Sequence, residues 1–117
     1  MTLQRIMLAA LALSLPAATF DVKWESNDVF SVGDRMFAMI WRAGEPRYAF
    51  KASDMAYELL IDQGLARPAP YLWRAKWVQL ADGDALSEED VAAYLREAHA
   101  IVAGKLTKKK RAELGLK

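Results

Sequence analysis

The sequence predicts one α+β domain in which helices cover one face of an antiparallel β-sheet of about five strands. Three observations support this. The length of 117 residues suits one core, 54% of the residues are hydrophobic, and apolar spacing changes between helical and alternating along the chain. The expected order is helix, four strands, helix, strand, helix. We treat residues 1–117 as one domain, with a short basic C-terminal tail from about residue 105.

The N-terminal segment is interpreted as the first helix of the domain, although it imitates a secretory signal. Arg5 precedes an apolar run that is too short to span a bilayer, and Pro16 should end the helix because a residue before proline avoids helical geometry. Thr2 is a candidate cap. The helical apolar stripe comprises Leu3, Ile6, Met7, Ala10, Leu11 and Leu13, with Gln4 and Arg5 opposite. We therefore expect a cytoplasmic protein without membrane association.

Alternating apolar and polar residues predict a meander of antiparallel strands after this helix. Residues 20–25 alternate as in a half-buried strand. A strand at residues 29–32 is joined by Gly33-Asp34 to another at residues 35–42, and residues 43–46 turn into a strand at residues 47–51. Residues 36–41 contain no polar side chain, which is typical of a central strand covered on both faces.

The second half of the chain predicts two capped helices around one strand. Ser53 should cap a helix that runs to about Gln63, and Ser87 should cap the last helix, with Asp90 at the capping-box position. Prolines 68 and 70 predict a loop over residues 66–70, and residues 76–81 predict a strand. The expected buried faces are Met55, Ala56, Leu59 and Leu60 in one helix and Val91, Tyr94, Leu95, Ala98, Ile101 and Val102 in the other.

Residue types exclude several kinds of site. The chain has no cysteine, which excludes disulfides, thiolate zinc sites and cysteine nucleophiles. His99 is the only histidine, and we expect it to be a structural or a surface residue and not a ligand or catalytic base. Five acids near the start of the last helix (Asp82, Asp84, Glu88, Glu89 and Asp90) suit a helix N-terminus without a metal. No catalytic motif is present, so we expect no enzyme, no cofactor and no metal.

The charge is nearly balanced overall but uneven along the chain. The net charge is +1, which gives no global attraction to polyanions. Residues 82–97 carry six acids against one base, however, and residues 105–117 carry six bases against one acid.

Five segments, in the same order, resemble the MmcQ/YjbR family of small proteins. They are Leu-Ala-Leu-Ser-Leu-Pro at residues 11–16, Val-Phe-Ser-Val-Gly-Asp-Arg-Met-Phe-Ala at residues 29–38, Phe-Lys-Ala at residues 50–52, Lys-Trp-Val at residues 76–78, and the acid-capped helix from Ser87. The resemblance implies a fold described as CyaY-like, in which the N-terminal helix belongs to the domain. It also implies DNA binding, with two β-hairpins acting as wings. Iron binding of the frataxin type uses acids on the first helix, and residues 2–15 contain none.

The resemblance directs attention to basic residues near the two hairpin turns. Arg35 follows Gly33-Asp34, and Arg42 and Arg47 flank residues 43–46. Residues 71–77 interleave aromatic and basic side chains, which is the composition of a stacking platform. Their alternating spacing favours instead the packing of Tyr71, Trp73 and Trp77 on the sheet, with Arg74 and Lys76 facing water. The candidate nucleic-acid-binding residues are Arg35, Arg42, Arg47, Lys51, Arg74, Lys76, Lys108, Lys109, Lys110 and Arg111.

Three classes of function remain open from the sequence, the last being an enzyme without a recognisable motif. The first is a small DNA-binding protein with little sequence readout. The second is a protein-interaction or small-ligand module, with a homodimer as one form, that uses the sheet face left uncovered by helices.

Overall fold

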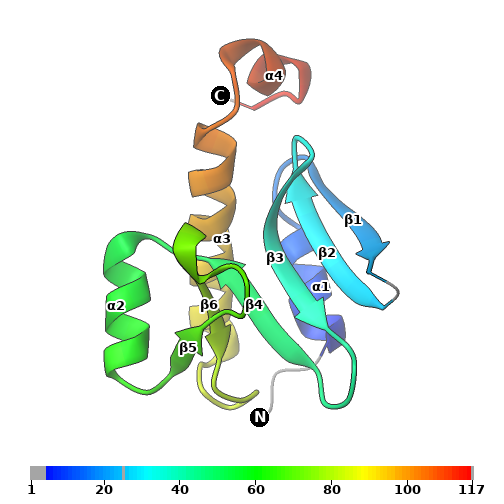
Figure 1. Ribbon diagram of the computed structural model, residues 1–117. Coiled ribbons are helices and arrows are strands. Elements are labelled where there is room, and N and C mark those ends of the chain that lie inside the picture. Colours follow the sequence, from blue (N-terminus) through cyan, green and yellow to red (C-terminus); the bar gives the residue numbers. More distant parts are fainter. Residues whose placement is uncertain (1–4, 25, 117) are drawn as a thin grey trace.

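Residues 5–24 and 26–116, which the computed structural model describes, form a six-stranded antiparallel sheet with helices (Figure 1). The strand order is β1-β2-β3-β4-β6-β5. The strands are β1 (Ala18–Lys23), β2 (Asn27–Val32), β3 (Arg35–Trp41), β4 (Arg47–Lys51), β5 (Ala66–Pro68) and β6 (Trp77–Leu80). The helices are α1 (Arg5–Leu13), α2 (Asp54–Asp62), α3 (Glu88–Gly104) and α4 (Lys108–Glu113), with a 3₁₀ helix η1 (Trp73–Ala75). The α+β class and the predicted order are confirmed.

Three elements are additional to the predicted ones: β5, η1 and α4. The predicted loop over residues 66–70 was wrong for Ala66–Pro68, which pair with β6 as β5. Proline fits there because β5 is an edge strand, where one N–H needs no partner. Part of the predicted basic tail forms α4, which Thr107 caps by accepting a hydrogen bond from the Lys110 N–H at 3.0 Å.

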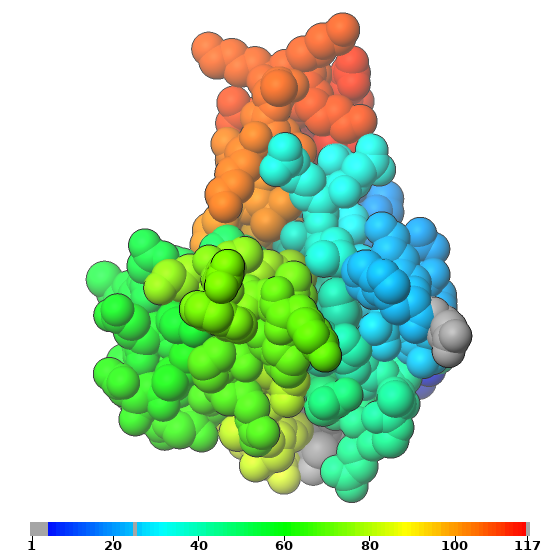
Figure 2. Space-filling model, viewed as in Figure 1, coloured from blue at the N-terminus to red at the C-terminus, as the bar shows by residue number. Residues whose placement is uncertain are grey.

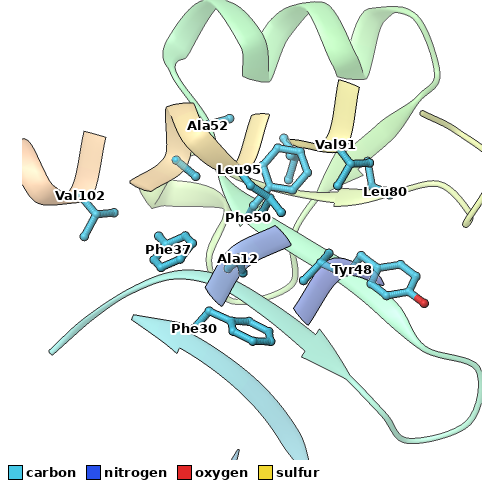
Figure 3. Close-up of a cluster of buried hydrophobic side chains, with 14 of the residues drawn as sticks. Ala12, Phe30, Phe37, Tyr48, Phe50, Ala52, Leu80, Val91, Leu95 and Val102 are labelled. Carbon is cyan, nitrogen blue, oxygen red and sulfur yellow. The ribbon is translucent and has the colours of Figure 1, made fainter. Parts of the chain in front are cut away.

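The main core lies between the sheet and the helices. α1 and α3 cross behind the sheet in the view of Figure 1. Figure 3 shows Phe30, Phe37 and Phe50, from three adjacent strands, gathered with Leu95 and Val102 of α3. Burial of each such side chain contributes about 1.5–3 kcal/mol, so the contact between α3 and the central strands supplies much of the stability.

The buried face of α1 differs from the predicted stripe. Leu8 and Ala12 are fully buried, whereas Ile6 is 80% exposed and Leu13 is also exposed. After Arg5 the helix is apolar all round from Ile6 to Leu13, so polar residues indicate little about which side faces the core. Thr2, Leu3 and Gln4, to which the predicted cap and part of the stripe belong, lie outside the described residues, as do Glu25 and Lys117.

The buried face predicted for α3 is confirmed at Val91, Leu95, Ala98 and Val102, whereas the face predicted for α2 was wrong at two of its four residues. In α2, Ala56 and Leu60 are buried, but Met55 and Leu59 are exposed. Ser53 and Ser87 cap α2 and α3, each accepting a hydrogen bond from a backbone N–H three residues later at 3.1 Å. No helix in the described part of the chain is long and apolar enough to cross a membrane.

β1 is confirmed as a strand, but its apolar side chains are almost half exposed. Phe20 and Val22 are 46% and 44% exposed, and Trp24, beyond the end of the strand, is 61% exposed. β1 is the edge of the sheet, so it has a neighbouring strand on one side.

His99 is structural, as expected. It is 7% exposed. Its Nε2 donates a hydrogen bond to the carbonyl oxygen of Pro16 at 2.7 Å, and its ring meets Phe37 edge-on at 5.4 Å between centroids. Because a carbonyl oxygen only accepts, Nε2 carries the proton. This contact holds the turn between α1 and β1 against α3.

The turn between β2 and β3 packs beneath the C-terminal helix (Figure 1). Gly33 has a left-handed backbone with φ of +57°. A Cβ atom at this position would lie 2.7 Å from Cδ1 of Leu106 and 3.3 Å from Cδ1 of Leu114. Glycine is therefore favoured by the left-handed backbone, and a larger residue would push against the side chains of Leu106 and Leu114.

We predict that Gly33→Ala destabilises the protein more than Gly44→Ala, by about 1 kcal/mol or more, because the extra methyl group overpacks the contact with Leu106. Gly44 is a matched control, since its φ is +77° but nothing lies within 4 Å of the added Cβ. Urea unfolding of both variants measures the difference. If both variants lose the same free energy of unfolding, the contact between Gly33 and Leu106 is too loose to resist the added methyl group.

Candidate functional site

The antiparallel topology brings most of the candidate basic residues to one end of the sheet. β3 begins with Arg35 where β4 ends with Lys51, and Lys51 pairs with Trp77, the residue after Lys76. α3 ends at the same place, with Lys105 as its C-cap. We call the ends of these elements, with the adjoining η1 and α4, the basic end. Its basic residues are Arg35, Lys51, Arg74, Lys76, Lys105, Lys108, Lys109, Lys110 and Arg111.

Lys51 lies at the centre of a cluster of like charges. Partial burial, followed by the charges of Lys105 and Lys76, lowers the pKa of Lys51, while the Asp54 carboxylate opposes the shift. Its Nζ donates a hydrogen bond to the carbonyl oxygen of Ala52 at 3.1 Å. Lys76 Nζ lies 4.7 Å from the ring centroid of Tyr57. An anion would relieve the repulsion within this cluster.

The first predicted hairpin turn and the C-terminal helix belong to the same end. Lys110 Nζ lies 3.9 Å from Oδ2 of Asp34, a loose and exposed ion pair. In Figure 2 the orange and red C-terminal residues form one end of the molecule, above the cyan hairpin. The β2–β3 turn, next to Arg35, and Lys110 of α4 are therefore neighbours in space, although more than 70 residues separate them along the chain.

The segment that interleaves aromatic and basic residues does not pack on the sheet as its spacing suggested. Tyr71 is 97% exposed and Trp73 is 50% exposed; Trp77 alone of the three is buried. Tyr71 and Lys76 have left-handed backbones with φ of 66° and 62°, which interrupt a strand and allow η1 to form. Arg74 lies over the ring of Trp73 at 5.3 Å. Two aromatic rings are thus presented to solvent beside the basic end.

Arg42 and Arg47, which flank the second predicted turn, lie at the opposite end of β3 and β4. Arg42 is held by a buried carboxylate that the sequence analysis missed. Its Nε donates a hydrogen bond to the carbonyl oxygen of Ser26 at 2.6 Å and lies 3.2 Å from Oδ1 of Asp28. Arg5 also pairs with Asp28, which is 1% exposed. The structure therefore gives Arg42 a structural contact instead of a free position at a hairpin tip.

We predict that Arg42→Ala lowers the free energy of unfolding by about 1–3 kcal/mol, because it leaves the buried Asp28 carboxylate with fewer partners. Arg96→Ala, on the exposed face of α3, is the control and should change the free energy of unfolding by less than about 0.5 kcal/mol. Chemical denaturation of the two variants measures the effect. Similar values for both would contradict the structural assignment of Arg42.

The sheet face opposite α1 and α3 holds a second, smaller apolar cluster and two hollows. The cluster contains Val29, Met39, Ala49, Ala69 and Trp77. One hollow, of about 380 Å³, is almost entirely apolar; Trp24, Asn27, Met36, Met39, Trp41, Pro70, Tyr71 and Leu72 line it. In Figure 2 the yellow-green segment around residue 72 lies beside the cyan strands on this face.

The second hollow is polar and lies at the end of the sheet away from the basic end. It has a volume of about 360 Å³ and lies between the β3–β4 turn and the segment after β6. Arg47, Arg67 and Gln79 line it together with Glu45 and Asp82. Within the described residues, no group of three or more His, Asp or Glu side chains is placed to hold a metal ion.

The fold and these surfaces define a small α+β domain with a basic end, an apolar hollow and a polar hollow. The model of the YjbR family matches residues 13–101, so the chain belongs to the YjbR family, as its sequence segments suggested. The crystal structure of the Deinococcus radiodurans protein DR2400, with the domain DUF419, has a TM-score of 0.82 and 25% sequence identity to this chain. The similarity covers 94% of this chain and 86% of that one. No curated protein matches the sequence.

Proposed function

We propose that the protein binds nucleic acid through the basic end, chiefly by contacts with phosphates. The observation that carries the proposal is the convergence of eight of the ten candidate residues on one surface, although the net charge is only +1. They are Arg35, Lys51, Arg74, Lys76, Lys108, Lys109, Lys110 and Arg111. A local concentration of positive charge attracts a polyanion even where the whole molecule is nearly neutral.

The side chains at the basic end suit a partner recognised by its backbone. Most are lysines, which act as flexible point charges and carry little base specificity. The exposed rings of Tyr71 and Trp73 lie beside them and can stack on unpaired bases. Of the two hairpin turns that the family resemblance implied as wings, the proposal uses Gly33-Asp34 and leaves out residues 43–46. We expect binding with little sequence preference.

The experiment is fluorescence anisotropy with random duplex and single-stranded DNA over a salt series. We expect affinity to fall linearly with salt on logarithmic axes, and the triple variant Arg74→Gln, Lys105→Gln and Lys108→Gln to reduce the slope for duplex DNA by about two to three. All three side chains are exposed, so their replacement should leave the fold intact.

The matched control is the triple variant Arg47→Gln, Arg67→Gln and Arg96→Gln, which removes the same charge from exposed arginines away from the basic end. It should retain the salt slope of the unaltered protein. Equal weakening by both variants would show that only net charge matters. Absence of binding at low salt would refute the proposal outright.

The apolar hollow favours a second candidate function, self-association through the open sheet face. Trp24 and Tyr71 line the hollow and are 61% and 97% exposed, which is costly for large apolar side chains. Sedimentation should then show a dimer that the double variant Trp24→Ser and Met36→Ser converts to a monomer. A monomer at all concentrations would exclude this candidate.

A further inference from the structure

The polar hollow combines three side chains that the strand register brings to one face of the sheet. Gln79 of β6 pairs with Ala49 of β4 on one side and with Arg67 of β5 on the other. Arg47 lies two residues before Ala49 and therefore points to the same face. This face is the one opposite α1 and α3, because Ala49 belongs to the smaller apolar cluster.

Gln79 is the unusual residue of this group. It is 5% exposed, and its Oε1 has no hydrogen-bond partner among the described residues. A buried amide oxygen without a donor is unfavourable, and few are found in folded proteins. The carboxamide lines the hollow, and its last torsion is soft, so it can turn towards a ligand at little cost. The site thus lacks one N–H or O–H donor, which a ligand can supply.

Charged side chains of both signs surround the same hollow. The guanidinium of Arg47 lies over the ring of Trp41 at 5.6 Å, which fixes its plane and leaves its N–H edges available. Arg67 is exposed on the neighbouring side. Glu45 and Asp82 supply negative charge, although Oδ1 of Asp82 already accepts a hydrogen bond from the Asp84 N–H at 2.7 Å. Two arginines alone would suit any anion, but the two acids favour a ligand that also carries a positive charge.

We propose that this hollow binds a small zwitterion of the α-amino-acid class. Arg47 and Arg67 hold the carboxylate, since a guanidinium matches the two oxygens of a carboxylate. The ammonium group donates to the carboxamide of Gln79 and faces Glu45 and Asp82. A hollow of about 360 Å³ accommodates a molecule of this size.

The inference is independent of nucleic-acid binding, because the hollow and the basic end share no residue. Variants of one surface therefore serve as controls for the other. Failure of either proposal leaves the other standing.

The experiment is a ¹H–¹⁵N NMR titration of the full chain with each of the common L-amino acids, and with acetate and methylamine as probes that carry a single charge. We expect at least one amino acid, at concentrations up to about 10 mM, to shift the side-chain amide of Gln79 and the backbone signals of residues 43–47 and 79–83. Acetate and methylamine should each bind at least about tenfold more weakly, because each makes only part of the contacts.

Two variants test the assigned contacts. Arg67→Gln and Gln79→Leu should each weaken binding of that amino acid about tenfold or more, whereas Arg96→Gln should not change it. Arg67 is exposed, so its replacement leaves the fold intact even if Gln79→Leu does not. If acetate binds as tightly as the amino acid, the hollow is a site for anions only, and the proposal is overturned. Absence of shifts with every amino acid would overturn it as well, and a water molecule would then satisfy Gln79.

Discussion

The packing of α3 across the sheet is the contact on which the rest of the structure depends. Val91, Leu95, Ala98 and Val102 are buried along one side of this helix, and they meet the phenylalanines of β2, β3 and β4. The contact fixes the direction of α3, and so the place where the chain leaves it at Lys105. Leu106 then seats against Gly33, which locks α4 above the β2–β3 turn. The packing of apolar side chains between α3 and the sheet thereby determines the position of the lysines of α4.

The antiparallel register separates the charges that the sequence intermixes. Arg42 and Arg47 are close to Arg35 and Lys51 along the chain, yet they lie at the other end of the same strands. There they meet different partners. Arg42 is bound to Asp28, and Arg47 lies on Trp41 beside the polar hollow. One end of the sheet is thus suited to a polyanion, and the other to a small ligand with charges of both signs.

Much of the fold could be predicted from local signals in the sequence. The caps Ser53 and Ser87 and the strand at residues 47–51 each depend on a few neighbouring residues, and the structure confirms all three. The alternation expected in β4 was wrong, because Tyr48, Ala49 and Phe50 are all buried in a strand that is covered on both faces. The buried face of α1 could not be predicted, because in a helix that is apolar from Ile6 to Leu13 the pattern does not indicate which side faces the core. β5 was missed because Pro68 argues against a strand unless the strand is known to lie at an edge.

The candidate sites were less predictable, because they depend on contacts distant in sequence. The basic residues could be named, but their division between two ends follows from strand pairing. The role of Arg42 depends on Asp28, which follows Ser26 and Asn27 at the start of β2 and whose burial beside Arg5 of α1 depends on contacts distant in sequence. Gln79 stood within the apolar strand at residues 77–80 as the single polar side chain, and that signal could have marked it.

The central claim is that nucleic acid binds at the basic end because positive charge is concentrated there, and not because of the net charge of the protein. Mapping backbone NMR shifts on addition of a short single-stranded oligonucleotide tests this claim most directly. The account predicts shifts concentrated at Arg35, Lys51, residues 71–76 and residues 105–111, with residues 43–47 and 79–83 unchanged. Shifts centred on residues 43–47, or spread evenly over all basic residues, would contradict it.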